Sequence, residues 1–134
     1  MNTVVIDTNI VLDLFVFKDP ASAPLAAALR SGEALWLATQ PMRDELARVL
    51  VYPHIASKMA FYKIEAAAVL AQFDQLAHLV PAAPKAAVTC KDPDDQKFID
   101  LALEHQTMLL SKDNAVLCME KRLLALGVIV QVAI

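Results

Sequence analysis

Short apolar runs alternate along this chain with longer amphipathic stretches, and that alternation narrows the fold more than any other feature. The runs predict strands; they cover 4–6, 34–38, 78–80, 108–110 and 128–132. Strands that are separated by helices pair in parallel, because the connection carries the chain back to the same end of the sheet. The sequence therefore predicts an α/β fold in which helices cover both faces of a mainly parallel sheet.

The helices expected between these strands have recognisable starts. Pro41 suits the first turn of a helix that runs to a point before Pro53. Asp92 is a good cap for another helix, with Pro93 at its first position. The remaining expected helices are 25–30, one or two helices within 58–75, the continuation of the Pro93 helix to about 104, and 115–126.

Glycine occurs only twice, at Gly32 and Gly127, and both positions fall where a helix is followed by a strand. Nucleotide-binding loops of the P-loop and dinucleotide types need several glycines directly after the first strand. This chain has none there. The sequence therefore excludes that class of phosphate-binding site.

Length and hydropathy predict one domain, covering 1–134, without a membrane span. The hydrophobic fraction of 57% and the mean hydropathy of +0.47 are high. The longest stretch without a charged residue, 123–134, is nevertheless shorter than the roughly 18 to 20 residues that cross a bilayer. The amino end lacks the basic segment of a secretory signal. We expect a soluble, cytoplasmic protein whose surplus of apolar residues fills a core and an interface with another copy or a partner.

The charge balance and the cysteines exclude further classes. The 12 basic and 15 acidic residues give a net charge of −3, which argues against a protein that grips nucleic acid through a broad basic surface. A protein that holds phosphate through metal ions bound to its own carboxylates stays possible. Cys90 and Cys118 are too few and too far apart for a disulfide framework or a Cys-x-x-Cys metal site, so we expect buried or idle thiols.

Two aspartates stand where a strand ends and a helix begins. Asp7 comes after the apolar run that ends at Ile6, and Asp113 follows the run 108–110 at the same kind of turn. Open α/β folds build their sites at the carboxyl edge of the sheet, where we expect both side chains. Each could instead only cap the helix that follows it. Ser111 shares a side of its strand with Asp113 and could orient a carboxylate or a metal-bound water.

Glu45 lies on the flank of the apolar stripe of its helix, three residues after Met42. A carboxylate in that position points toward the edge of the core and needs a partner. An ion pair with Arg48 or Arg43 on the same helix would supply one, and taken alone this interpretation is favoured. Its neighbour Asp44 falls on a more exposed side and is interpreted as solvated.

The acidic stretch 92–95 offers one more candidate. Asp95 falls in the first turn of its helix, at helical spacing from Phe98, on the face that packs inward. The helix dipole favours an acid at this end by roughly 0.3 to 1 kcal/mol, so helix stabilisation is the alternative explanation for every acid of the stretch. Asp94 and Asp100 fall closer to the polar side and rank below Asp95.

Several carboxylates near one sheet edge repel one another unless a cation or raised pKa values relieve them. A divalent metal ion would relieve Asp7, Glu45, Asp95 and Asp113 together. Ligands that are all oxygen, without a cluster of His or Cys, favour Mg²⁺ or Mn²⁺ over Zn²⁺. The three histidines are scattered along the chain and form no such cluster.

In their order and spacing, the acidic segments resemble the PIN-domain family of nucleases, especially the toxin components of VapBC-like toxin–antitoxin pairs. The matching segments are Val5-Ile6-Asp7-Thr8-Asn9, the helical stretch 42–50 around Glu45, Asp92-Pro93-Asp94-Asp95 with 98–102 behind it, and Leu110-Ser111-Lys112-Asp113. The resemblance covers essentially the whole chain.

The resemblance implies a three-layer α/β/α sandwich around a mainly parallel sheet. It also implies a catalytic quartet and supporting polar residues: Asp7, Glu45, Asp95 and Asp113, with the three aspartates as metal ligands, and Thr8, Asn9 and Ser111 in support. Many relatives have Thr in place of Ser111, which keeps the hydroxyl. Some carry another acid shortly after the last Asp, and 114–117 offers none here, which leaves a second metal position open.

The leading hypothesis is a metal-dependent endoribonuclease that cleaves single-stranded RNA with Mg²⁺ or Mn²⁺. The resemblance further implies a toxin role, a cognate antitoxin protein and a homodimer. Candidate phosphate contacts are Lys91, Lys97, Lys112 and Arg43, with solvated surface positions as the alternative. A catalytically weak or inactive module that acts through protein–protein contacts is the competing hypothesis. Phosphoryl transfer through an aspartyl intermediate is disfavoured, because Asn9 stands where the second Asp of that chemistry is needed.

Overall fold

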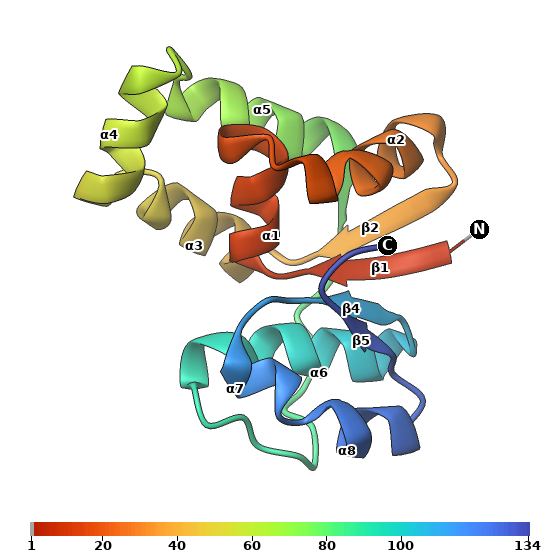
Figure 1. Ribbon diagram of the computed structural model, residues 1–134. Helices are drawn as coiled ribbons and strands as arrows, with labels where there is room; N and C mark the ends of the chain where they lie inside the picture. Colours follow the sequence, from red (N-terminus) through yellow and green to blue (C-terminus); the bar gives the residue numbers. More distant parts are fainter. Residues whose placement is uncertain (1) are drawn as a thin grey trace.

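The computed structural model describes residues 2–134 and contains a five-stranded sheet between two layers of helices (Figure 1). The strands are β1 (Asn2–Ile6), β2 (Ala34–Ala38), β3 (Ala77–Leu79), β4 (Met108–Leu110) and β5 (Val130–Gln131), in the spatial order β3-β2-β1-β4-β5. Every neighbouring pair is parallel. The predicted α/β/α sandwich with a central parallel sheet is therefore confirmed.

Helices cover both faces of the sheet (Figure 1). One layer holds α1 (Thr8–Leu12), α2 (Ala23–Ser31), α3 (Gln40–Val49), α4 (Pro53–Phe61) and α5 (Ala66–Leu76); the other holds α6 (Gln96–His105), α7 (Asn114–Leu117) and α8 (Glu120–Ala125). Short helical turns flank them: the π-helical η1 (Asp13–Phe17) and the 3₁₀ turns η2 (Pro20–Ser22) and η3 (Pro93–Asp95). No helix within residues 2–134 is long and apolar enough to cross a membrane.

Two stretches differ in detail from the expected helices. The stretch 58–75 is divided between α4 and α5, with Lys63 between them at a φ of 58°. The single helix expected over 115–126 is wrong, because α7 and α8 are separate. Met119 leaves the helical region between them (φ −97°, ψ 3°), and its side chain is buried together with Val116 and Leu123.

The core on the α1–α5 face is built around Trp36 of β2, which is 1% exposed. Its ring lies 6.1 Å from that of Phe15 and 4.9 Å, edge to face, from that of Phe73. On the other face, α6 buries Ile99 and Leu101 completely. Burial of these apolar side chains from both layers holds the sheet in place between them.

The register of β1 and β4 determines where the site forms. Ile6 is the partner of Leu110, so the residues that follow these two strands lie side by side at the carboxyl edge. The backbone N–H of Asp7 extends this pairing by donating to the carbonyl of Leu110 at 3.0 Å. The first polar residues after each strand, Asp7 and Ser111, therefore meet at the centre of the edge.

Candidate active site

Asp7 stands at the end of the central strand and begins α1. Its Oδ1 accepts a hydrogen bond from the backbone N–H of Asn9 at 2.8 Å, so it caps the helix as the alternative interpretation expected. Its Oδ2 accepts from the hydroxyl of Ser111 at 2.6 Å. Burial raises the pKa of Asp7 above its usual value; these two hydrogen bonds oppose that rise, while the charges of Asp113 and Glu45 reinforce it.

Ser111 connects two of the predicted site residues. Its side chain is fully buried directly after β4. The hydroxyl that donates to Asp7 also accepts from the backbone N–H of Asp113 at 3.1 Å. Asp113 in turn caps α7 by accepting from the N–H of Ala115 at 2.9 Å. One buried hydroxyl therefore fixes the two aspartates relative to each other.

Replacing Ser111 with alanine should destabilise the fold by about 1 to 3 kcal/mol, because it leaves Asp7 Oδ2 and the N–H of Asp113 without this buried partner. Urea unfolding measures the loss. Ser57→Ala on the exposed surface of α4 is the control and should change stability by less than about 0.5 kcal/mol. Equal stability of Ser111→Ala and the wild type would refute the structural importance of this hydroxyl.

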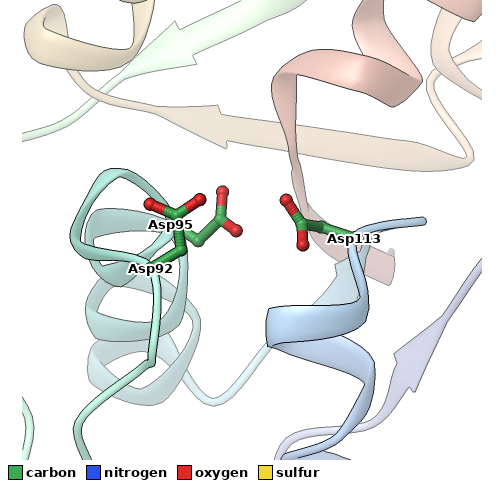
Figure 2. A group of neighbouring side chains, drawn as sticks. All are labelled: Asp92, Asp95 and Asp113. Atoms are coloured by element: carbon green, nitrogen blue, oxygen red, sulfur yellow. The ribbon is translucent and has the colours of Figure 1, made fainter.

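Three aspartates bring carboxylate oxygens together at the starts of α6 and α7. Figure 2 shows Asp92 and Asp95, from the turn that leads into α6, facing Asp113. One oxygen from each lies within 4.8 Å of those from the other two. Asp95 is 8% exposed, and the other two are half-buried. The group is thus closed on the protein side and open toward solvent through its outer members.

Burial and neighbouring carboxylates shift the pKa of Asp95 strongly. Burial, followed by its hydrogen bond with Asp113 and the negative charge of that residue, raises the pKa of Asp95 to about 8. The charges of Asp7 and Asp92 act in the same direction. Its Oδ2 is buried and has no hydrogen-bond partner among the described residues. A buried acceptor without a partner is costly, so this atom needs a cation or a proton.

A divalent cation fits this donor set. The available atoms are carboxylate oxygens from Asp92, Asp95 and Asp113, with Asp7 close enough for its charge to raise the pKa of Asp95. Hard oxygen donors suit Mg²⁺ or Mn²⁺. A cation would also satisfy the unpaired Oδ2 of Asp95 and remove the repulsion that raises its pKa.

Glu45 points from α3 toward the start of α6, and its two oxygens are engaged. Oε1 lies 2.6 Å from Nζ of Lys97, and Oε2 accepts from the hydroxyl of Thr8. The ion pair that we expected with Arg48 or Arg43 is therefore not formed. The reason is geometric: the side chain faces across the edge to another element rather than along its own helix.

The remaining predicted polar residues divide into those at the site and those away from it. Asn9 contributes its backbone N–H, while its side chain is exposed. Arg43 forms a two-pronged ion pair with Asp74 at 2.7 and 2.8 Å. Lys112 pairs with Asp13 at 2.5 Å. These two cations are thus held by other acids, and Lys91 is exposed on the loop before Asp92.

Sequence reasoning missed one member of the acidic group and misplaced another acid. Asp92 does cap its turn, by accepting from the N–H of Asp94 at 2.9 Å, but it also belongs to the group. Its spacing of three from Asp95, one helical turn, was the available signal. The polar placement of Asp100 is wrong: it is 9% exposed and accepts from the backbone N–H of Ala86 at 2.9 Å, which fastens the preceding loop.

Comparison with known families agrees with this geometry. A family model described as the PIN domain matches residues 3–115. No match was found among curated proteins. The matched region starts in β1 and ends in α7, so it contains Asp7, Glu45, Asp95 and Asp113 together with the strands and helices that place them. On this match over most of its length, the chain belongs to the PIN-domain family, a family of nucleases.

Proposed function

We propose that this protein is a metal-dependent endoribonuclease that cleaves single-stranded RNA. The observation that carries the proposal is the buried, unpaired Oδ2 of Asp95 within a group of three carboxylates. Such a group is costly without a cation and well suited to hold one. When bound, Mg²⁺ or Mn²⁺ supplies a water of lowered pKa and positive charge for the scissile phosphate.

The residues of the chain would divide the work between them. Asp7, Asp95 and Asp113 are the proposed metal ligands, to which the geometry adds Asp92. Ser111 keeps Asp7 and Asp113 at a fixed separation through its two hydrogen bonds. Because the nucleophile would be water, no serine or cysteine needs to act on the phosphate.

The toxin role and the partners are part of the same proposal. The resemblance of the four acidic segments to VapBC-like toxins supports RNA as substrate, a cytoplasmic location and an antitoxin partner. Large apolar side chains around α4 support an interface with an antitoxin or a second copy: Val51, Tyr52, Phe61 and Tyr62 are 69%, 48%, 79% and 48% exposed. Exposed apolar patches of this kind mark interaction surfaces.

The test is cleavage of single-stranded RNA by the purified protein with Mg²⁺ or Mn²⁺, with EDTA as the blank. Asp7→Asn should lower the rate by about 100-fold or more, because it removes a charge from the proposed ligand set. Asp44→Asn is the matched control, since Asp44 is exposed on α3 and bonds only to Gln40 among the described side chains. Equal cleavage by Asp7→Asn and the wild type would remove this site from the reaction.

Expression in cells separates the nuclease from an inactive interaction module. Growth arrest on induction that Asp7→Asn relieves supports the toxin. Normal growth with the wild-type protein, together with tight binding of a partner, supports the module instead. The apolar surface around α4 fits either outcome, so the decision rests on the acidic site.

A further inference from the structure

We propose that Gln96 and Asp100 of α6 are positioning residues for the proposed metal site, because they fasten the loop 86–90 between the helix starts that carry the aspartates. The inference rests on the proposed function, from which it takes the metal. The loop contacts both α6, whose start carries Asp95, and α7, which Asp113 caps. Its attachment therefore helps to set the separation between these two carboxylates.

The side-chain amide of Gln96 makes three hydrogen bonds, and two of them hold the loop. Oε1 accepts from the backbone N–H of Cys90 at 2.6 Å, and Nε2 donates to the carbonyl oxygen of Val88 at 3.0 Å. Nε2 also donates to Oδ1 of Asp100 at 2.7 Å. Because the amide has one acceptor atom and two N–H donors, only one orientation of the side chain satisfies all three partners. The loop is thus held by the residue directly after Asp95.

Asp100 holds the other end of the loop. Its side chain is buried, and Oδ1 accepts both from Gln96 and from the backbone N–H of Ala86 at 2.9 Å. No cationic side chain within residues 2–134 forms a salt bridge with Asp100. Its role is therefore that of a hydrogen-bond acceptor, and the oxygen of an asparagine could accept the same two bonds.

The same loop reaches α7 through Cys90, which is 5% exposed. The thiol donates to the carbonyl oxygen of Ala115 at 3.4 Å, while the N–H of Ala115 donates to Oδ1 of Asp113 at 2.9 Å. One residue of α7 is therefore held by the loop at its carbonyl and by a site carboxylate at its N–H. Figure 2 shows Asp92 and Asp95 facing Asp113, so the loop connects the two sides of the acidic group.

The loop and the Ser111 hydroxyl act on different parts of the acidic site. Ser111 connects Asp7 to Asp113, whereas the loop connects the turn of Asp92 and Asp95 to the helix that Asp113 caps. Groups that orient metal ligands from outside contribute roughly 10- to 100-fold to metal affinity. A loop that is fastened only to stabilise the fold would affect unfolding and leave metal affinity unchanged.

Calorimetric titration of the purified protein with Mg²⁺ and with Ca²⁺ tests the positioning role. Gln96→Met keeps the length of the side chain and removes its hydrogen bonds. Mg²⁺ affinity should fall about 10-fold or more, because the separation of the carboxylates is no longer fixed. Mg²⁺ demands a near-ideal octahedron, whereas Ca²⁺ accepts variable geometry, so Ca²⁺ affinity should fall by less than about threefold.

Asp100 allows the same test at a position that is not adjacent to a proposed ligand. Asp100→Leu removes the acceptor of Ala86 and Gln96 and should lower Mg²⁺ affinity about 10-fold or more. Asp100→Asn keeps an acceptor oxygen and should stay within about threefold of the wild type, well short of the cost of losing an orienting group. This conservative variant separates the effect of hydrogen bonding from the effect of charge.

Thr107→Val is the control for a general loss of stability. Thr107 is buried directly before β4, at the edge of the sheet opposite to Asp113, and its hydroxyl donates to the carbonyl oxygen of Met108 at 3.0 Å. The variant should lower the midpoint of urea unfolding in EDTA, as Gln96→Met should, because each loses a hydrogen bond that is shielded from water. Its Mg²⁺ affinity should match that of the wild type.

Mg²⁺ affinity that is unchanged in Gln96→Met and Asp100→Leu overturns the positioning role. Equal losses of Mg²⁺ and Ca²⁺ affinity also overturn it, because the loop would then not set the geometry. So does a loss in Thr107→Val as large as that in Gln96→Met. Wild-type protein that binds Mg²⁺ without cleaving RNA overturns only the proposed nuclease, and wild-type protein that binds neither Mg²⁺ nor Mn²⁺ overturns both.

Discussion

Replacing Asp95 with asparagine should make the metal-free protein more stable while it abolishes the proposed RNA cleavage. The two effects have opposite signs because the same carboxylate is costly to the fold and necessary to the site. Its side chain is 8% exposed, its Oδ2 has no partner among the described residues, and its pKa is raised to about 8. Asparagine has nearly the same shape and carries no charge, so it removes the cost and the ligand together.

The gain in stability follows from the proton that Asp95 holds. At pH 7 the unfolded chain has already lost this proton, since the usual pKa is 3.8, whereas the folded protein retains it. Folding of the wild type must therefore take up a proton at a pH where the proton is scarce. Asparagine needs none. We expect the free energy of unfolding in EDTA to rise by about 2 to 4 kcal/mol at pH 7.

Metal should reverse the order of stability, so that the wild type becomes more stable than Asp95→Asn. A ligand that binds only the folded state at 1,000 times its dissociation constant adds about 4.1 kcal/mol to stability, which offsets the difference expected in EDTA. The wild type should gain this amount in Mn²⁺, and Asp95→Asn should gain much less because it has lost one of the three carboxylates of the group. Cleavage by the variant should fall about 100-fold or more.

Urea unfolding at pH 7, in EDTA and in Mn²⁺, measures both changes beside a cleavage assay. Asp94→Asn is the matched control, because Asp94 is exposed in the same turn and its side chain lies outside the acidic group. It should change stability by less than about 0.5 kcal/mol. A metal-free Asp95→Asn protein that is less stable than the wild type would show that the carboxylate supports the fold instead of straining it.

The site residues that follow strands could be predicted from the sequence. The end of a strand is visible in a short stretch of sequence, and the carboxyl ends of parallel strands lie at one edge of the sheet. Asp7 and Asp113 each follow an apolar run, and parallel strands must end at the same edge. Their capping role could be predicted as well and does not compete with the site. One oxygen of each caps its helix, and Oδ2 of Asp7 is left to accept from Ser111.

The parts that depend on two elements meeting in space could not be predicted in the same way. Glu45 and Lys97 are 52 positions apart, and their ion pair exists because the fold brings the middle of α3 close to the start of α6. Helical periodicity identified only the partners on the helix of Glu45 itself, Arg43 and Arg48. Likewise, Asp100 has the polar spacing of a surface residue, yet the loop before α6 folds over it and donates the N–H of Ala86.

Fold prediction shows the same division. The five strands follow from short apolar runs, and their parallel pairing follows from the helices between them. The break between α7 and α8 does not follow from the sequence pattern, because the apolar residues of 115–126 have continuous helical spacing. Met119 is buried in the gap between the two helices, and the packing that draws it inward comes from the rest of the molecule.

The metal-free wild type should lose stability as the pH rises from about 4 to about 8. Within this interval the folded protein keeps the proton of Asp95, whose pKa is about 8, while the unfolded chain releases it near 3.8. Stability falls with pH wherever the folded state binds more protons than the unfolded state. One proton sets a slope of up to about 1.4 kcal/mol per pH unit, which ends above pH 8.

Other groups with shifted pKa values do not reverse this sign. The pKa of Asp7 is raised by burial, so Asp7 adds to the loss in the same direction. The hydrogen bond from Arg43 lowers the pKa of Asp74, and the stability that it contributes is lost only when the pH falls below about 3.8. Burial raises the pKa of Cys90 above 9.0, beyond the upper end of the interval.

Urea unfolding in EDTA at pH 5, 6.5 and 8 measures the slope of the free energy of unfolding against pH. Two comparisons test whether Asp95 causes this slope. Asp95→Asn should show a flatter profile, because the group that holds the extra proton is gone. Mn²⁺ should stabilise the wild type more at pH 8 than at pH 5, since a cation competes with the proton for the same oxygens. A wild type whose metal-free stability rises between pH 5 and 8 would mean that the acids at this edge are paired with cations in solution, and the case for a metal ion between them would lose its electrostatic basis.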